Sequence, residues 1–483
     1  MKNLNRRNFL KCAAATTIAN ISTGCSSRGY FASKAKPNVV FILIDDMGWK
    51  DLSCYGSKIY KTPAIDQLAN DGVLFSNAYA AHPMCLPSRV ALMSGKYPVR
   101  YGAPGGTHPK GHSVLPLSDF TIAEAMKANG YQTFFAGKWH IGQKGAFPEN
   151  QGFDINLGGH TAGQPASYFY PYKNEKKVAN VPNLDGGKNG EYLTDRLTDE
   201  TVNFIKANKN KPFFVYLSHY AVHTPLEAKK DLVDQSQKII DGTTFQGPAW
   251  TKEGPADRKM HQDNATYAAM VTSVDDSVAK IRKTLKALDL DENTIIVFTS
   301  DNGGDACKKD KIAKATSVIP LRGGKCWMYE GGIRVPMIVR WPGIAKAGTI
   351  SDQVVTGPDH YPAILEMAGL PLRPKDHVDG KSYAPILSGK SNESRGPVFW
   401  HFPNLTLFDW VVGSENCSAV RDGKYKLIEF LDNNYVELYD LENDIEEKHD
   451  LSKKMPQKTS QMHQTLINWR KNVNAPGPMR KNN

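Results

Sequence analysis

The pentapeptide Cys85-Leu86-Pro87-Ser88-Arg89 carries the most reactive combination of side chains in the chain. It joins a sulfur nucleophile to a fixed cation, and the apolar run 90–93 after it predicts the start of a buried helix. A thiol at a helix N-terminus beside an arginine is expected to have a lowered pKa and to lie where anions are favoured. The alternative is a buried cysteine with a purely structural role.

Four further polar clusters each follow a stretch that reads as a buried strand, at 37–44, 131–136, 212–218 and 294–300. The clusters are Asp45/Asp46, Lys138/His140, His219/His223 and Asp301/Asn302. Each pair taken alone is as well explained by a turn or a surface position. Together they are informative, because the carboxyl ends of parallel strands line one edge of a sheet.

The residue types divide into three chemical sets. Asp45, Asp46, Asp301 and Asn302 offer only oxygen ligands, which suit a hard cation such as Ca²⁺ or Mg²⁺. Arg89, Lys138 and Lys325 offer positive charge to an anionic ester. His140 and His223 are able to move protons near neutral pH.

These residues, in this order, resemble the formylglycine-dependent type I sulfatases of the alkaline phosphatase superfamily. The resemblance rests on Cys-x-Pro-Ser-Arg, Gly-Lys-Trp-His at 137–140, His-Thr-Pro at 223–225, Asp301-Asn302 and Lys325 before Glu-Gly-Gly-x-Arg-Val-Pro, and it covers about residues 37–470. It implies a sulfatase in which Cys85 is oxidised to formylglycine (3-oxoalanine), whose hydrate attacks sulfur.

The same resemblance assigns the other roles. Asp45, Asp46, Asp301 and Asn302 would hold one Ca²⁺, and Lys138 and Lys325 would bind the sulfate group. Arg89, His140 and His223 would act with Cys85 in catalysis, with His223 protonating the leaving oxygen. His219 stands outside the family pattern and is expected to be a packing residue.

Two other functions fit part of the pattern. A phosphate or phosphonate monoester hydrolase of the same superfamily can share the cysteine signature, although its two-zinc phosphatases carry Asp-His where this chain has Asp301-Asn302. An inactive glycan-binding protein would be expected to have lost Cys85 or a calcium ligand, and none is lost.

The expected substrate is a sulfated polysaccharide or oligosaccharide, either a seaweed galactan or a glycosaminoglycan. Candidate sugar contacts are His82, His160, Arg322 and the aromatic loop 165–175, which lies in a long irregular insertion at 143–192. Packing of the aromatic rings onto the sheet is the alternative. The composition gives no indication of nucleic-acid binding.

The expected fold is α/β, an alkaline-phosphatase-like sandwich with a large, mixed, mostly parallel sheet between helices. Residues 36–374 would form the catalytic domain. Residues 375–483, with short strands near 398–440 and a helix over 455–473, would form a smaller α+β subdomain with a short antiparallel sheet. The polar stretch 229–262 is predicted to be a loop.

Residues 1–35 resemble an export leader. Arg6-Arg7 followed by a weakly apolar stretch is similar to a twin-arginine signal, and Gly24-Cys25 is similar to an imperfect lipobox. The expected location is therefore the periplasm or cell envelope, with the membrane reached only through a lipid on Cys25. A formylglycine-generating enzyme or an anaerobic sulfatase-maturing enzyme is the expected protein partner.

The remaining composition is that of an ordinary globular chain of 483 residues, with a formal charge of +11. Four of the positive charges lie in residues 1–24, which contain no acid. The mildly basic balance suits an anionic substrate as well as it suits a generic surface. In an oxidising compartment Cys307 and Cys326 are the nearest candidates for a disulfide, although sequence does not fix connectivity.

Overall fold

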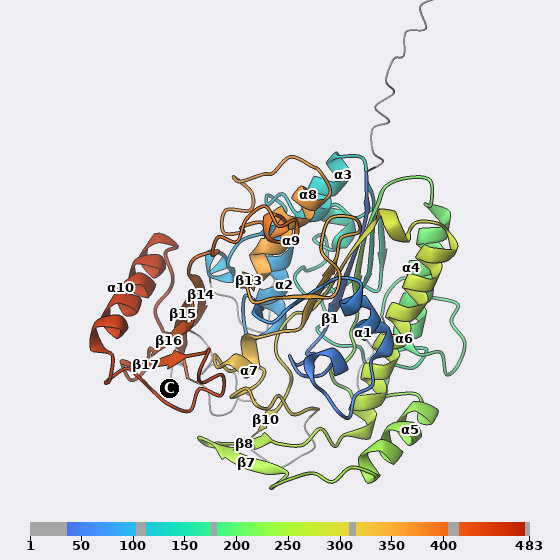
Figure 1. Cartoon of the computed structure of the whole chain (residues 1–483). Coiled ribbons are helices and arrows are strands. Elements are labelled where there is room, and N and C mark those ends of the chain that lie inside the picture. The colour runs from blue at the N-terminus through green and yellow to red at the C-terminus, as the bar shows by residue number, and fades with distance from the viewer. Residues whose placement is uncertain (1–35, 103–112, 175–180, 309–314, 404–414, 479–483) are drawn as a thin grey trace, which may run out of the picture. The chain divides into compact units, whose positions relative to one another are not determined.

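The computed structural model describes residues 36–102, 113–174, 181–308, 315–403 and 415–478, and the leader lies outside these ranges. Residues from Lys36 onward form one compact unit (Figure 1). Within the described ranges, no helix has both the length and the apolar character that a membrane span requires.

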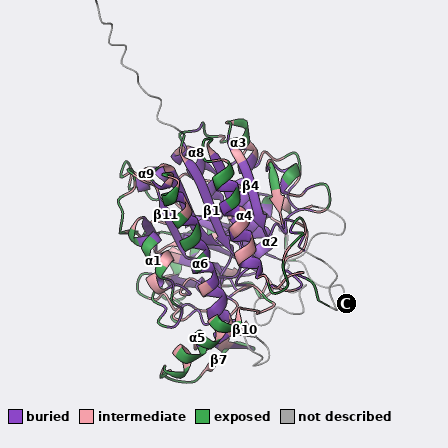
Figure 2. Cartoon of the chain, turned by 90° about the vertical axis from the view of Figure 1, so that its right-hand side faces the viewer, coloured by how far each residue is buried: buried purple, intermediate pink, exposed green. Residues whose placement is uncertain are grey.

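An eight-stranded mixed sheet forms the centre of this unit, in the order β12-β2-β11-β9-β1-β6-β4-β5. The strands are β1 (Asn38–Ile44), β2 (Val73–Phe75), β4 (Gln132–Gly137), β5 (Ile155–Leu157), β6 (Phe213–Ser218), β9 (Thr294–Ser300), β11 (Met337–Arg340) and β12 (Thr349–Ser351). The run β9-β1-β6-β4-β5 is parallel, whereas β11 pairs antiparallel with both β9 and β2. Every residue of β1 is buried, which explains its unbroken apolar sequence (Figure 2).

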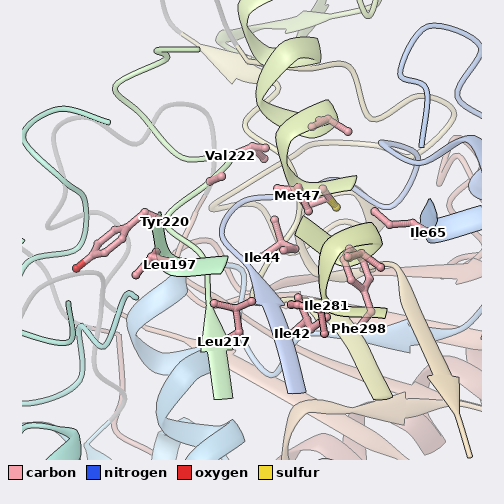
Figure 3. Close-up of a cluster of buried hydrophobic side chains, with 14 of the residues drawn as sticks. Ile42, Ile44, Met47, Ile65, Leu197, Leu217, Tyr220, Val222, Ile281 and Phe298 are labelled. Carbon is pink, nitrogen blue, oxygen red and sulfur yellow. The ribbon is translucent and has the colours of Figure 1, made fainter. Parts of the chain in front are cut away.

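Helices cover both faces of the sheet. One face carries α1 (Pro63–Asn70), α4 (Leu193–Ala207) and α6 (Ala265–Ala287), which pack on alternate sheet residues such as Ile42, Leu217 and Phe298 (Figure 3). The other carries α2 (Cys85–Ser94), α3 (Ile122–Ala128), α8 (His360–Met367) and α9 (Ala384–Leu387). Side chains of β1 alternate between the two clusters because successive residues of a strand point to opposite faces.

A four-stranded antiparallel sheet stands beside this core, with the strands β14 (Val398–Phe402), β15 (Cys417–Asp422), β16 (Tyr425–Phe430) and β17 (Tyr435–Asp440) in sequence order. Helix α10 (Pro456–Asn472) packs against it. The predicted fold class, a mixed and mostly parallel sheet between helices with a small antiparallel sheet after it, is confirmed. The domain boundary near residue 374 stays a prediction.

Shorter elements complete the described chain. Strands β3 (Ala78–Tyr79) and β13 (Val355–Thr356) pair with each other, and helix α7 (Glu330–Ile333) is a single turn. Turns of 3₁₀ helix occur at Ser53–Tyr55, Pro98–Tyr101, Pro148–Asn150, Asp291–Asn293 and Gly357–Asp359.

The prediction of a loop over 229–262 is wrong. This stretch forms helix α5 (Lys230–Asp241) and the hairpin β7 (Trp250–Glu253) and β8 (Ala256–Lys259), which β10 (Cys307–Lys308) extends to three strands. Apolar residues such as Ile239 and Ile240 hold α5 against the cluster around α6. The few apolar residues of this helix recur on one face, but the sequence is polar on average, which is why the stretch resembles a loop.

Candidate functional site

Four adjacent strands bring the predicted polar clusters to one edge of the sheet. Asp45 follows β1, Asp301 follows β9, Lys138 follows β4 and His219 follows β6, and these strands stand in the order β9-β1-β6-β4. Helix α2 supplies Cys85 and Arg89, and Lys325 comes from the segment before α7. The site therefore exists because four parallel strands end side by side.

Each carboxylate of the site lies against a cation. Lys138 Nζ is 2.6 Å from Asp45 Oδ2, Lys325 Nζ is 2.6 Å from Asp46 Oδ2, and Arg89 Nε donates to Asp301 Oδ2 at 2.8 Å. All of these residues are buried except Lys325, whose side chain is 9% exposed. Buried charges persist only when they are paired or bind an ion, so this arrangement has to be understood as one electrostatic unit.

Burial and ion pairing shift the pKa values of the three acids in different directions. Burial raises the pKa of Asp45 in spite of Lys138 and Arg89, and it raises the pKa of Asp301. Burial opposes ionisation of Asp46 as well, but Lys325 and His223 outweigh it and hold the pKa of Asp46 below its usual range. Such contrasting shifts are characteristic of functional sites.

The oxygen-rich cluster fits a divalent cation. Asp45 Oδ1 and Asn302 Oδ1 are buried without a hydrogen-bond partner, and Asn302 Nδ2 donates to Asp46 Oδ1 at 2.8 Å. Ligand atoms of Asp45, Asp46 and His223 lie within 4.8 Å of one another, as do those of Asp45, Cys85 and Asp301. Buried acceptors without donors are costly in an isolated protein, and a hard cation would satisfy them.

Cys85 is the first residue of α2 and is buried. Its Sγ lies 3.5 Å from Nδ1 of His140. The expectation of a lowered thiol pKa is wrong: burial raises the pKa of Cys85 and outweighs the nearby Lys138 and Lys325. The unmodified side chain is therefore a thiol at neutral pH, which is a weak nucleophile.

The two predicted proton carriers contact different members of this cluster. His140 faces Cys85, whereas His223 Nε2 lies 3.6 Å from Asp46 Oδ2. Burial, reinforced by Lys325, lowers the pKa of His223 to about 3, so its ring is neutral in the protein alone. His219 points elsewhere, with Nε2 3.0 Å from Ser277 Oγ on α6, as expected of a packing residue.

Two residues that support the site were not predicted. Ser218 Oγ accepts from Arg89 at 2.7 Å and donates to the carbonyl of Lys138 at 2.8 Å, so it links two of the cations. Gly163 lies against the ring of His140, where a Cβ atom would come within 2.7 Å of Cε1. Neither residue carries a signal in a single sequence, because a serine at a strand end and a glycine in a loop are common.

The candidate sugar contacts are mostly occupied by the protein itself. His82 is buried against the ring of Phe402, with 4.4 Å between ring centroids, so its ring packs against the protein itself. Tyr168 and Tyr172 of the 165–175 loop are also buried, and the Tyr168 hydroxyl donates to the backbone carbonyls of Tyr220 and His223. The aromatic loop therefore packs against the segment that carries His223. This is the alternative in which the aromatic rings serve packing.

The other two candidates are half-buried. Tyr220 Oη lies 3.2 Å from Nδ1 of His160, whose backbone carbonyl accepts from His140 N–H. Arg322 pairs with Glu253 at 2.9 Å and stacks over the ring of Tyr329. The charge of Arg322 is thus already compensated.

Comparison with known proteins gives matches over nearly the whole described chain. Residues 37–370 match a family model described as Sulfatase, and residues 324–472 match one described as N-sulphoglucosamine sulphohydrolase, C-terminal. N-acetylgalactosamine-6-sulfatase of Rattus norvegicus is 32% identical, over 83% of this chain and 73% of its own. Arylsulfatase of Hemicentrotus pulcherrimus is 33% identical, over 83% of this chain and 68% of its own.

Solved structures give the same result. The structure of Ps i-CgsB in complex with k-i-k-neocarrahexaose is 33% identical with a TM-score of 0.74, covering 90% of this chain and 92% of that one. A phosphonate monoester hydrolase of Agrobacterium radiobacter has a TM-score of 0.64 at 20% identity, over 90% and 96% of the two chains, which is a likeness of fold alone. The predicted alkaline-phosphatase-like fold is confirmed.

Proposed function

The chain belongs to the sulfatase family and is a sulfuric ester hydrolase, and from this premise we propose that it removes sulfate from a sulfated polysaccharide or oligosaccharide. The names of two similar proteins support a glycan substrate. They are the N-acetylgalactosamine-6-sulfatase and the structure in complex with a neocarrahexaose. A seaweed galactan and a glycosaminoglycan both remain within the proposal.

The observation that carries the mechanism is the buried cluster in which Lys138, Lys325 and Arg89 surround Cys85 and the acids. Three fixed cations in a buried site stabilise the charge of a sulfate group and of the transition state more strongly than they would in water. We propose that Lys138 and Lys325 bind the sulfate oxygens. Arg89, oriented by Asp301 and Ser218, holds negative charge beside residue 85.

We propose that Asp45, Asp46, Asp301 and Asn302 hold one Ca²⁺. The buried acceptor atoms without donors, Asp45 Oδ1 and Asn302 Oδ1, support this assignment. The ion would add positive charge next to the sulfate oxygens.

We further propose that a formylglycine-generating or anaerobic sulfatase-maturing enzyme converts Cys85 to formylglycine. In its hydrated form this aldehyde supplies the oxygen nucleophile that a buried thiol of raised pKa does not offer. His140 Nδ1, 3.5 Å from Sγ of Cys85, is placed to accept and return a proton at residue 85.

His223 is proposed to donate a proton to the departing sugar oxygen. Its pKa is low in the protein alone because of burial and Lys325. A bound sulfate ester brings negative charge next to both groups, which favours the protonated ring. Tyr168 holds the backbone carbonyl of His223 through its hydroxyl, which fixes the position of the donor.

We propose that the leader directs the protein to the periplasm or cell envelope, with Cys25 as the candidate lipid anchor. An exported enzyme would meet glycans too large to enter the cell.

The test is expression of the full chain with either maturing enzyme, followed by mass spectrometry of the peptide that spans Cys85. A mass that corresponds to the aldehyde or its hydrate is expected, together with sulfate release from a panel of sulfated galactan and glycosaminoglycan oligosaccharides. Cys85→Ala is expected to abolish release, whereas Cys54→Ala, which changes a thiol remote from the site, retains it. Full activity of Cys85→Ala would refute the mechanism. Hydrolysis of an aryl sulfate without release from any glycan would refute the substrate class.

A further inference from the structure

A pocket of about 180 Å³ lies beside the site, between the turn of the β7–β8 hairpin, the segment 327–329 and strands β15 to β17. In Figure 1, α7 lies between the β7–β8 hairpin, which is below it, and the C-terminal sheet, which is to its left. Of the residues given a role above, only Arg322, a candidate sugar contact, lines this pocket.

The segment 325–327 connects the pocket to the site. Trp327 lines the pocket two residues after Lys325, and the N–H of Cys326 donates to the carbonyl of Pro83 at 2.9 Å. Met84, the neighbour of Cys85, packs in the same buried cluster as Trp327. Two residues of extended chain span about 7 Å at most, so the Cα atoms of Trp327 and Lys325 lie no farther apart than this.

One wall of the pocket is an aromatic platform. The ring of Tyr435 stacks on Phe430, with centroids 4.4 Å apart and planes inclined by 10°. Its hydroxyl donates to Glu415 Oε1 at 3.4 Å, and 40% of the residue is exposed. The ring is therefore held in place from one side while its other face is open, which suits contact with the apolar face of a sugar.

The polar groups of the pocket are mainly acidic. Glu253, Glu415 and Glu437 line it, against the single cation Arg322. Arg322 is committed to Glu253 and to the ring of Tyr329, which lies 3.8 Å from the guanidinium carbon. Glu253 pairs with Arg258 as well, so the negative charge of the pocket comes from Glu415 and Glu437, for which the described residues provide no ion pair. The neighbouring site, in contrast, is rich in cations.

One acceptor is left for a ligand. The hydroxyls of Tyr329 and Tyr439 both donate to Glu437 Oε2 at 2.8 Å. Among the described residues no donor reaches Glu437 Oε1. Carboxylate oxygens accept strong hydrogen bonds from hydroxyl groups, so this atom suits a sugar hydroxyl.

We infer that this pocket is a subsite for an unsulfated sugar ring, the neighbour of the ring whose sulfate is removed. The aromatic face and the free carboxylate oxygen bind a neutral ring that carries hydroxyls. The same carboxylates repel a ring that carries its own sulfate, because like charges brought together in a pocket are strongly unfavourable. The enzyme would thus select glycans by the sulfation of the next residue as well as by the scissile ester. This inference rests on the proposed glycan substrate.

The test uses the matured full-length enzyme and two kinds of substrate. One is an aryl sulfate that is too small to reach the pocket. The other is a sulfated disaccharide from which the enzyme releases sulfate, prepared in two forms. One form carries sulfate on the scissile ring alone, and the other carries a second sulfate on the neighbouring ring. The wild type is expected to favour the singly sulfated form by tenfold or more in kcat/KM, a ratio equivalent to about 1.4 kcal/mol. Tyr435→Ala is expected to raise KM for that form about tenfold while kcat/KM for the aryl sulfate stays within twofold.

Reversal of a charge in the pocket provides the second part of the test. Glu415→Lys is expected to raise kcat/KM for the doubly sulfated form about tenfold. The matched controls are Tyr425→Ala, on the neighbouring strand β16, and Glu446→Lys, outside the pocket. Both should leave kcat/KM for the two disaccharides unchanged. If Tyr435→Ala and Glu415→Lys leave both disaccharides unaffected, or the wild type prefers the doubly sulfated form, the inference is overturned and the proposed function stands. If the aryl sulfate is hydrolysed and no disaccharide is, the proposed function fails and the inference with it.

Discussion

Gly163→Ala provides a direct test of how the loop holds His140. An alanine Cβ at this position would lie 2.7 Å from Cε1 and 2.8 Å from Nε2 of the imidazole. Ordinary van der Waals contact begins at 3.4 Å, so the ring or the loop has to move by about 0.7 Å. The φ angle of Gly163 is not in the left-handed region, so the strain comes from the contact and not from the backbone.

The ring has little freedom to move without loss. His140 has a φ of 66°, its N–H donates to the carbonyl of His160 at 3.0 Å, and its Nδ1 faces Cys85 Sγ at 3.5 Å. A displacement of about 1 Å at a reacting group costs about 10²-fold in rate. We therefore expect kcat to fall 10- to 100-fold, a loss of about 1.4 to 2.7 kcal/mol of transition-state stabilisation.

Steady-state kinetics on matured protein measures this effect. KM should change less than threefold, because Lys138 and Lys325 are untouched. Gly242→Ala is the matched control, since its Cβ would meet only carbonyl oxygens of α5 at 3.4 Å or more. Mass spectrometry of residue 85 confirms equal maturation, and thermal unfolding confirms that both variants are folded. A Gly163→Ala enzyme with unchanged kcat, fully matured and folded, would refute the positioning role of this loop.

Three further outcomes are expected. Lys426→Met should destabilise the fold by about 3–5 kcal/mol in urea unfolding, because buried Glu447, 2.9 Å from Lys426 Nζ, loses its ion-pair partner, and buried Glu330, at 3.0 Å, is left with Arg334. Lys424→Met, at the surface of the same sheet, should leave it unchanged. Removal of calcium from the matured enzyme by a chelator should lower both activity and the unfolding temperature, and calcium should restore them, because the ion binds only the folded carboxylate cluster; activity that is indifferent to chelation would contradict the assignment. Burial lowers the pKa of three histidines outside the site to about 3, and these are His82, His219 and His360. Between pH 6.5 and about 3 the unfolded chain binds protons at these histidines that the native state does not, so each histidine should lower the free energy of unfolding by about 2 kcal/mol from pH 7 to 5. Buried acids of raised pKa such as Asp51 and Asp301 contribute with the opposite sign, so the contribution is isolated by urea titrations of the wild type and of His360→Gln at the two pH values. An equal change of stability in the two proteins would contradict it.

The sequence by itself determined the strands and the residues that follow them. Uninterrupted apolar runs such as 38–44 and 294–300 are long enough and apolar enough to be buried on both faces. Once such strands are parallel, their carboxyl ends have to meet, so Asp45, Lys138 and Asp301 were predictable as neighbours. The signature around Cys85 and the helix it begins are equally local in origin.

The tertiary structure alone decided what each of these groups experiences. The thiol pKa of Cys85 depends on how deeply α2 is buried, and burial there outweighs the helix terminus and the lysines. Ile239 and Ile240 of helix α5 pack against the cluster around α6, and no local pattern specifies that partner. His82 has the residue type of a ligand contact, yet Phe402 covers it from a strand 320 residues later.

The same reason explains the contacts of Gly163 and the pocket beside Tyr435. Both depend on surfaces from segments far apart in the chain, and one sequence records neither the distance between them nor the solvent they exclude. Residue type and local periodicity fix which side chains are available for chemistry, whereas long-range packing fixes their charge, their partners and their access to a substrate.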